Sequence, residues 1–94
     1  MSDEQVCRAV VTVTLADGLH LRPLTQIARV AQSFEASTSL RKGNQVADGK
    51  RPLDLMTLAA MCGEQLEVET RGVDADAAAA AIVALFECNF EDDQ

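Results

Sequence analysis

The sequence predicts an α+β sandwich in which helices cover one face of a mostly antiparallel sheet, and three observations lead to this prediction. Strand-like and helix-like segments follow one another in the order strand, helix, strand, strand, helix, strand, helix. The strand-like segments alternate apolar and polar residues, as strands do when one face of a sheet is buried and the other is solvated. A short hairpin turn joins the second and third strands, so this pair runs antiparallel.

The length and composition predict a single domain. Of the 94 residues, 48% are hydrophobic and 24% are charged, which is the usual balance of a soluble globular protein. We therefore expect one domain over residues 1–94, with a core at about 6–89 and a flexible acidic tail at about 90–94.

The first third of the chain predicts a strand, a turn and an amphipathic helix. Residues 7–15 alternate as a strand. Its apolar face consists of Cys7, Ala9, Val11, Val13 and Leu15. Residues 16–18 turn the chain, and residues 21–33 form the helix. The apolar residues at helical spacing are Leu24, Ile27, Ala28, Ala31 and Phe34.

The middle of the chain predicts a hairpin and a short helix. Residues 36–41 alternate as a strand, residues 42–44 supply the turn, and residues 45–47 form the return strand. After a second turn, a proline at the first position suits a short helix over 52–58 or a little beyond. Gly63 ends this region.

The last third predicts one strand and one helix. Residues 65–71 are the clearest strand of the chain, and its apolar face consists of Leu66, Val68 and Thr70. Asp74 is of a residue type that caps helices, and we expect it at the N-cap of the final helix. The expected buried stripe of that helix is Ala78, Ala81, Ile82 and Leu85.

Charge and cysteine usage exclude several classes of function. The net charge of −7, with no basic stripe, argues against nucleic acid as a partner. No apolar run approaches the ~20 residues that span a bilayer, and the first residues lack the pattern of a signal peptide, so we expect a cytoplasmic protein. The 3 cysteines show no short paired spacing, which argues against a disulfide framework or a zinc site, and we expect buried, reduced thiols.

A candidate site lies where the first turn meets the first helix. His20 is the only histidine, and Pro23 follows it where the missing proline N–H costs a helix nothing. The free donors and partial positive charge of a helix N-terminus favour an anion. Arg22 adds a planar guanidinium matched to phosphate oxygens. The pattern predicts a phosphate-accepting imidazole at His20; the alternative is a turn or cap residue.

The basic residues are unevenly distributed along the chain. Six of them lie between positions 20 and 51, namely Arg22, Arg29, Arg41, Lys42, Lys50 and Arg51. Residues 64–94 are mainly acidic. This polarity would steer a negatively charged protein surface toward His20, although a solvated surface with no role explains it equally well.

The run Gly18-Leu19-His20-x-Arg22-Pro23 resembles the phosphorylation site of the histidine-containing phosphocarrier (HPr) family of the phosphoenolpyruvate-dependent phosphotransferase system. The similarity extends from about Val11 to about Asn89. It implies an open-faced sandwich of four antiparallel strands and three helices. The chain would then be a monomeric phosphoryl carrier that serves partner enzymes and is not itself an enzyme.

The resemblance also implies a mechanism and a set of site residues. Nδ1 of His20 would accept a phosphoryl group from phosphorylated enzyme I and pass it to an enzyme II A component or a regulatory target. Arg22 would stabilise the phosphate, and neither a metal nor a cofactor is expected. The residues implied in partner docking are Leu21, Pro23, Arg29, Arg51, Leu53 and Met56. For Leu21, Leu53 and Met56, the alternative is an ordinary place in the core.

Three positions depart from the family pattern. Arg51 stands where many members carry a regulatory serine, so regulation by phosphorylation of a serine at this site cannot operate. Asp54 stands where many members carry a small or basic residue, and Leu21 replaces a smaller one. These changes are compatible with a nitrogen-type or otherwise divergent system and an altered partner surface.

Two other functions compete with the carrier. The first is a regulatory binding module that docks a kinase or a transcription factor, with phosphotransfer secondary or lost. The second is a small enzyme using Glu64, Glu67 and Glu69 as acid and base. Adjacent glutamates on the exposed side of one strand are usually only solvated, and neither a second nucleophile nor a nucleotide-binding loop accompanies them.

Overall fold

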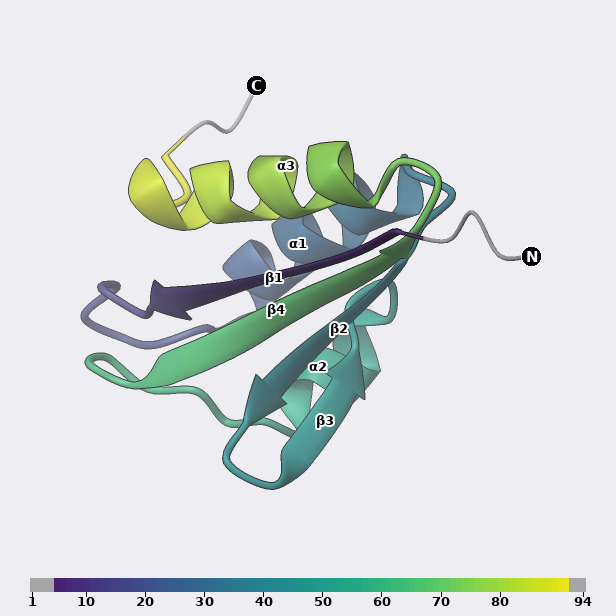
Figure 1. The fold of residues 1–94 in the computed structure, drawn as a ribbon. Coiled ribbons are helices and arrows are strands. Elements are labelled where there is room, and N and C mark those ends of the chain that lie inside the picture. Colours follow the sequence, from purple (N-terminus) through teal and green to yellow (C-terminus); the bar gives the residue numbers. More distant parts are fainter. Residues whose placement is uncertain (1–4, 92–94) are drawn as a thin grey trace.

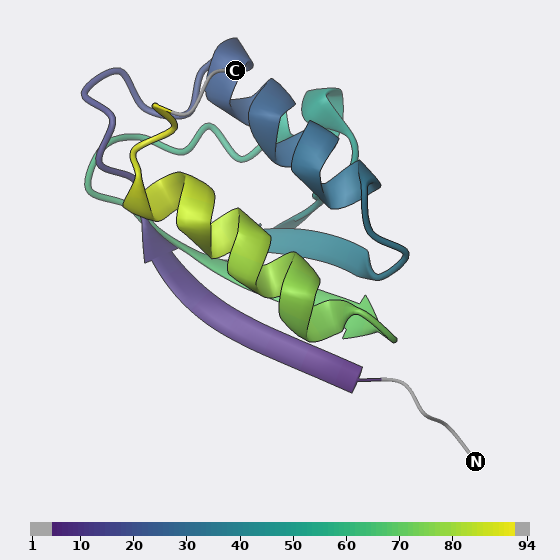
Figure 2. The same cartoon turned by 90° about the horizontal axis from the view of Figure 1, so that it is seen from above.

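A computed structural model describes residues 5–91, and its architecture is the predicted α+β sandwich (Figures 1 and 2). In chain order the elements are β1 (Gln5–Thr12), α1 (Leu21–Gln32), β2 (Ser37–Lys42), β3 (Gln45–Asp48), α2 (Pro52–Met56), β4 (Gln65–Gly72) and α3 (Ala75–Glu87). This order confirms the seven predicted elements, with boundaries that differ by a few residues. The largest differences are the earlier ends of β1 and α2.

The sheet has the strand order β1-β4-β2-β3, and every neighbouring pair is antiparallel. The long central strand β4 pairs with β1 from Gln5↔Gly72 to Thr12↔Gln65. In Figure 2, α1 and α3 lie side by side over the sheet. The opposite face carries the polar residues of β4, as the alternation predicts.

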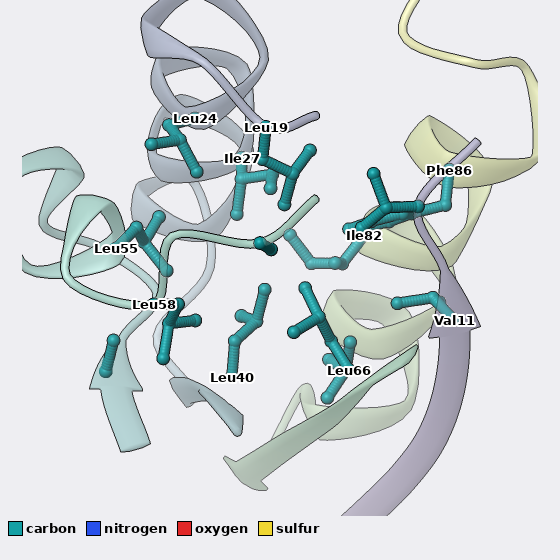
Figure 3. Packing of buried hydrophobic residues seen from close by; sticks show 14 of the residues in the cluster. Val11, Leu19, Leu24, Ile27, Leu40, Leu55, Leu58, Leu66, Ile82 and Phe86 are labelled. Atoms are coloured by element: carbon teal, nitrogen blue, oxygen red, sulfur yellow. The ribbon is translucent and has the colours of Figure 1, made fainter. Parts of the chain in front are cut away.

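One continuous core lies between the helices and the sheet. In Figure 3, side chains from all three helices point toward those of the strands. The labelled members are Val11, Leu19, Leu24, Ile27, Leu40, Leu55, Leu58, Leu66, Ile82 and Phe86. The apolar stripe of α1 is buried as predicted, apart from Phe34, which is only half-buried.

The start of α3 corrects one detail of the sequence prediction. Asp74 is the N-cap residue, but its side chain makes no capping hydrogen bond to the helix. Its carboxylate instead accepts the backbone N–H groups of Glu35 at 3.0 Å and Ala36 at 2.8 Å, and so fastens α3 to the segment before β2. Asp74 therefore joins two parts of the chain that are distant in sequence.

The buried stripe of α3 differs in part from the predicted one. The buried residues are Ala75, Ala78, Ala79, Ile82 and Phe86. Ala81 and Leu85, which were expected in the stripe, are only partly buried. A helix rich in alanine has little amphipathic contrast, so packing against the sheet and α1 decides which face is buried.

Stability should depend on the charge of Asp74. The pKa of this carboxyl group is lowered, chiefly because the backbone N–H of Glu35 donates to it, with the Ala36 N–H contributing further. A lowered folded-state pKa stabilises the fold above the ordinary value of 3.8, and this contribution is lost as the pH falls through the folded-state pKa. Asp74→Asn should lower the urea midpoint of unfolding at neutral pH. As the pH is lowered, the midpoint of this variant should decrease less than that of the native protein. Equal pH profiles for Asp74→Asn and the control Asp76→Asn would contradict this assignment.

The C-terminal end of the core lies beyond the predicted boundary. Phe90 was assigned to the tail, but it is 1% exposed and contacts the ring of Phe86 edge-on, with 4.9 Å between ring centroids. Asn89 accepts the Thr14 hydroxyl at 2.7 Å. Asn89 and Phe90 have φ angles of 58° and 59°, which turn the chain back onto the core. Of the other predicted tail residues, Glu91 is exposed, and residues 92–94 lie outside the described residues.

The prediction that the cysteines are buried is wrong. Cys62 is exposed in the connection before β4, and Cys88 is exposed at the end of α3. Cys7 faces the sheet's buried side but is only half-buried. No helix within residues 5–91 is long and apolar enough to cross a membrane.

Candidate functional site

His20 is the residue on which α1 begins. Its backbone is extended, with φ −84° and ψ −169°, and its carbonyl accepts the N–H of Leu24 at 3.1 Å as the first hydrogen bond of the helix. Its side chain makes no capping hydrogen bond and is exposed. Because the backbone carries out the capping role, the imidazole is left available to solvent and to a partner.

The first turn of α1 provides donors for an anion. Within the described range 5–91, the backbone N–H groups of Leu21 and Arg22 have no acceptor, and Pro23 carries no N–H. These two donors lie at the positive end of a helix of 12 residues. A phosphoryl group on His20 would therefore be next to unpaired donors.

The turn before His20 is fixed against a distant part of the chain. Gly18 donates its N–H to the Leu15 carbonyl at 2.9 Å and has a φ of +76°. The Leu19 N–H donates to the Ala60 carbonyl at 2.9 Å, and the Leu19 side chain is buried. The residue next to His20 is thus held both by the core and by the connection between α2 and β4.

Gly18→Ala should destabilise the fold by about 2–3 kcal/mol for two reasons. Alanine is strained in the left-handed backbone conformation of this residue, and its Cβ would clash with a neighbouring atom. A Cβ at Gly18 would lie 2.7 Å from the Ala60 carbonyl oxygen, which belongs to the backbone and cannot move freely. Gly43 is a matched control, since its φ is +60° but a Cβ there would have nothing within 4 Å. Gly43→Ala should cost only about 1 kcal/mol in urea unfolding. Equal losses for both variants would show that the contact with Ala60 is unimportant.

Arg22 lies in the same helical turn as His20, with an exposed side chain. Its Nη1 donates to Gln26 Oε1 at 3.3 Å and to the carbonyl of Phe90 at 3.5 Å. These contacts turn the guanidinium toward the C-terminal segment. Both distances are long for hydrogen bonds, so their loss would cost little when an anion competes for Arg22.

The residues expected in partner docking differ in their exposure to solvent. Leu21, Leu53 and Met56 are 58%, 77% and 48% exposed, so they are not core residues. Arg29 and Arg51 are exposed as well. Pro23 is a correction: it is buried, because the first turn of α1 packs against the core, and its side chain cannot form part of a docking surface.

Sequence reasoning missed one exposed apolar residue beside the turn before His20. Met61 is 56% exposed, and its Sδ would lie 3.4 Å from a Cβ at Gly18. It belongs to an irregular connection, where no periodic pattern distinguishes surface from core. Its place next to Gly18 depends on a contact between segments more than 40 positions apart in the sequence.

Asp54 and two of the three glutamates considered for acid–base chemistry, Glu64 and Glu69, have structural contacts. Asp54 Oδ2 accepts the Asp48 N–H at 2.7 Å and thereby links α2 to the end of β3. The pKa of Glu64 is lowered, chiefly because the backbone N–H of Met61 donates to it, and Lys42 contributes further. Glu69 is paired with Arg71 at 2.6 Å on the open face of the sheet. Among the described residues, no cluster of three or more His, Cys, Asp or Glu is arranged to hold a metal ion.

Comparison with known proteins identifies the family. A family model described as the PTS HPr component phosphorylation site matches residues 7–88. The phosphocarrier protein NPr of Escherichia coli K12 is 32% identical over 87 residues, which cover 92% of this chain and 97% of NPr. The crystal structure of the phosphocarrier protein HPr from Bacillus anthracis matches with a TM-score of 0.81 at 28% identity, over 86% of this chain and 96% of that one.

A longer relative contains a similar segment. The multiphosphoryl transfer protein of Xanthomonas campestris is 38% identical over 66 residues, which cover 70% of this chain but only 8% of that protein. The match to the family model includes His20 and nearly the whole described fold. The chain therefore belongs to the HPr family of phosphocarrier proteins of the phosphotransferase system.

Proposed function

We propose that this chain accepts a phosphoryl group on His20 from phosphorylated enzyme I and passes it to an enzyme II A component or a regulatory target. The observation that carries the proposal is an exposed imidazole at the N-cap of α1, next to the two unpaired N–H groups of Leu21 and Arg22. These donors complement the charge that a phosphoryl group brings.

In the proposed transfer, the lone pair of His20 Nδ1 attacks the phosphorus of the donor's phosphohistidine. A new N–P bond forms at His20 as the donor's N–P bond breaks, and the electron pair of that bond returns to the donor's ring nitrogen. Arg22 leaves its long contacts with Gln26 and Phe90 and pairs with the phosphoryl oxygens. In the second transfer, a nucleophile of the acceptor attacks the same phosphorus. The N–P bond at His20 breaks, and its electron pair returns to His20 Nδ1.

The proposed docking surface consists of Leu21, Leu53, Met56, Arg29 and Arg51. Its apolar members are exposed on α1 and α2, which pack against one another. Exposed apolar residues bordered by cations suit a partner with an apolar contact area and an acidic rim. The same observation favours the second candidate function, a regulatory module that docks a kinase or a transcription factor.

Incubation with phosphoenolpyruvate and a purified enzyme I tests the proposal. We expect one acid-labile phosphoryl group per chain, and NMR of the imidazole should locate it on Nδ1. No label with an enzyme I that phosphorylates another HPr would overturn the proposal. A partner that binds the native protein and His20→Ala equally, but not Leu53→Glu, would support the regulatory module.

Arg22→Ala should slow phosphoryl transfer roughly tenfold, because a charge-assisted contact to the transferring group is lost. The control is Arg41→Ala, which removes the same charge from an exposed position on β2, outside the proposed docking surface. Rapid-quench measurements of transfer from phosphorylated enzyme I compare the two variants. Equal effects would mean that Arg22 contributes only general charge and has no particular contact with the phosphoryl group.

A further inference from the structure

The carbonyl of Ala60 joins the turn before His20 to the connection between α2 and β4. It accepts the N–H of Leu19, the residue before His20, at 2.9 Å, and it also occupies the space beside Gly18. The position of the backbone just before His20 therefore depends on the contacts that hold residues 59–61 in place. These residues belong to the irregular connection between α2 and β4, where neither helix nor strand hydrogen bonding fixes the backbone.

Lys42 and Glu64 hold this connection on both sides of Ala60. Lys42 Nζ donates to the Ala59 carbonyl at 3.2 Å and to Glu64 Oε1 at 3.3 Å. The same Glu64 oxygen accepts the Met61 N–H at 2.7 Å. One lysine and one carboxylate thus bind the residues immediately before and after Ala60.

The two side chains start from fixed backbone. Lys42 is the last residue of β2 and pairs with Gln45 in the hairpin. The Glu64 carbonyl accepts the Val13 N–H at 2.9 Å, and the Glu64 N–H donates to the Met61 carbonyl at 3.0 Å. Ala59 has a φ of 47°, a left-handed conformation that a residue other than glycine adopts only when its surroundings hold it there.

We propose that Lys42 and Glu64 are positioning residues for phosphoryl transfer, which act on His20 through Ala60 and Leu19. The proposal rests on the proposed function and extends it to two residues that contact neither the phosphoryl group nor the docking surface. A partly exposed ion pair adds little to global stability. Its effect here is on geometry, because an imidazole that is displaced from the line of attack transfers a phosphoryl group more slowly even when docking is intact.

Variants at Glu64 and Lys42 test the proposal in transfer from phosphorylated enzyme I. Glu64→Ala and Lys42→Met should each lower kcat on the order of tenfold and leave KM nearly unchanged, since the docking residues are elsewhere. Glu64→Gln keeps an acceptor for the Met61 N–H and should restore most of the rate. In NMR spectra, the amide signals of Leu19 and His20 should shift in Glu64→Ala and return toward their native positions in Glu64→Gln.

Glu69→Ala is the matched control. It removes a glutamate from β4, the strand that begins just after Glu64, and breaks the ion pairs with Arg71 and Arg8, but no hydrogen bond joins Glu69 to residues 59–61. It should change neither kcat nor the two amide signals. A native rate in Glu64→Ala, or an equal loss in Glu69→Ala, would overturn the positioning role while the carrier function stands. Failure of the native protein to accept phosphate would overturn the carrier function itself, and the positioning role with it.

Discussion

His20→Gln is expected to abolish phosphorylation by enzyme I and phosphoenolpyruvate, reducing the acid-labile label to background. Glutamine is polar and of similar length but has no ring nitrogen to form the N–P bond. The fold should be unaffected, because the imidazole is exposed and makes no capping hydrogen bond. Stability in urea should therefore remain within about 0.5 kcal/mol of the native value. Intact-mass measurement and the acid lability of the label check both expectations.

The same variant separates loss of chemistry from loss of docking. Since Leu21, Leu53 and Met56 are unchanged, excess His20→Gln should compete with the native protein for phosphorylated enzyme I and slow its labelling. Leu53→Glu in the same background should remove this competition. His20 is the only histidine of the chain. A label that persists in His20→Gln would therefore be on a residue other than histidine and would contradict the assignment of His20 as the acceptor.

Sequence reasoning predicts this site because its signals are local. The turn at Gly18, the proline of the first turn and the cation beside His20 all lie within 6 consecutive residues. Helix starts depend on such short-range patterns of caps and proline. The order of strands and helices also follows from local periodicity, and the structure confirms it.

What the sequence did not reveal depends on contacts between distant segments. The Asp74 carboxylate binds backbone 38 and 39 positions away, so residue type alone suggested an ordinary cap. Arg22 reaches Phe90 across 68 positions. Lys42 meets Glu64 across 22 positions, and nothing in either local pattern relates them to His20. The expectation of buried thiols failed for a related reason, since irregular connections carry no periodicity from which burial can be inferred.

Phe90→Ala is expected to destabilise the protein by about 3–5 kcal/mol, the usual loss when a fully buried phenylalanine is truncated. Phe90 is 1% exposed and its ring rests edge-on against Phe86, so the substitution leaves a cavity in the core next to Phe86. A flexible tail beginning at about residue 90 would instead make the change nearly neutral. The urea midpoint, combined with the slope of the unfolding transition, measures the difference directly.

Two comparisons assign this loss to the packing of Phe90. Phe34→Ala removes the same atoms from a half-buried position and should cost only about 1 kcal/mol. A double-mutant cycle of Phe86→Ala and Phe90→Ala should give a coupling of about 0.5–1.5 kcal/mol, because each ring forms part of the other's contact surface. No coupling, with a small loss for Phe90→Ala, would mean that the chain end does not pack on the core in solution. Arg22 would then lack its contact with Phe90, and its guanidinium would be free to reach His20 without first breaking that contact.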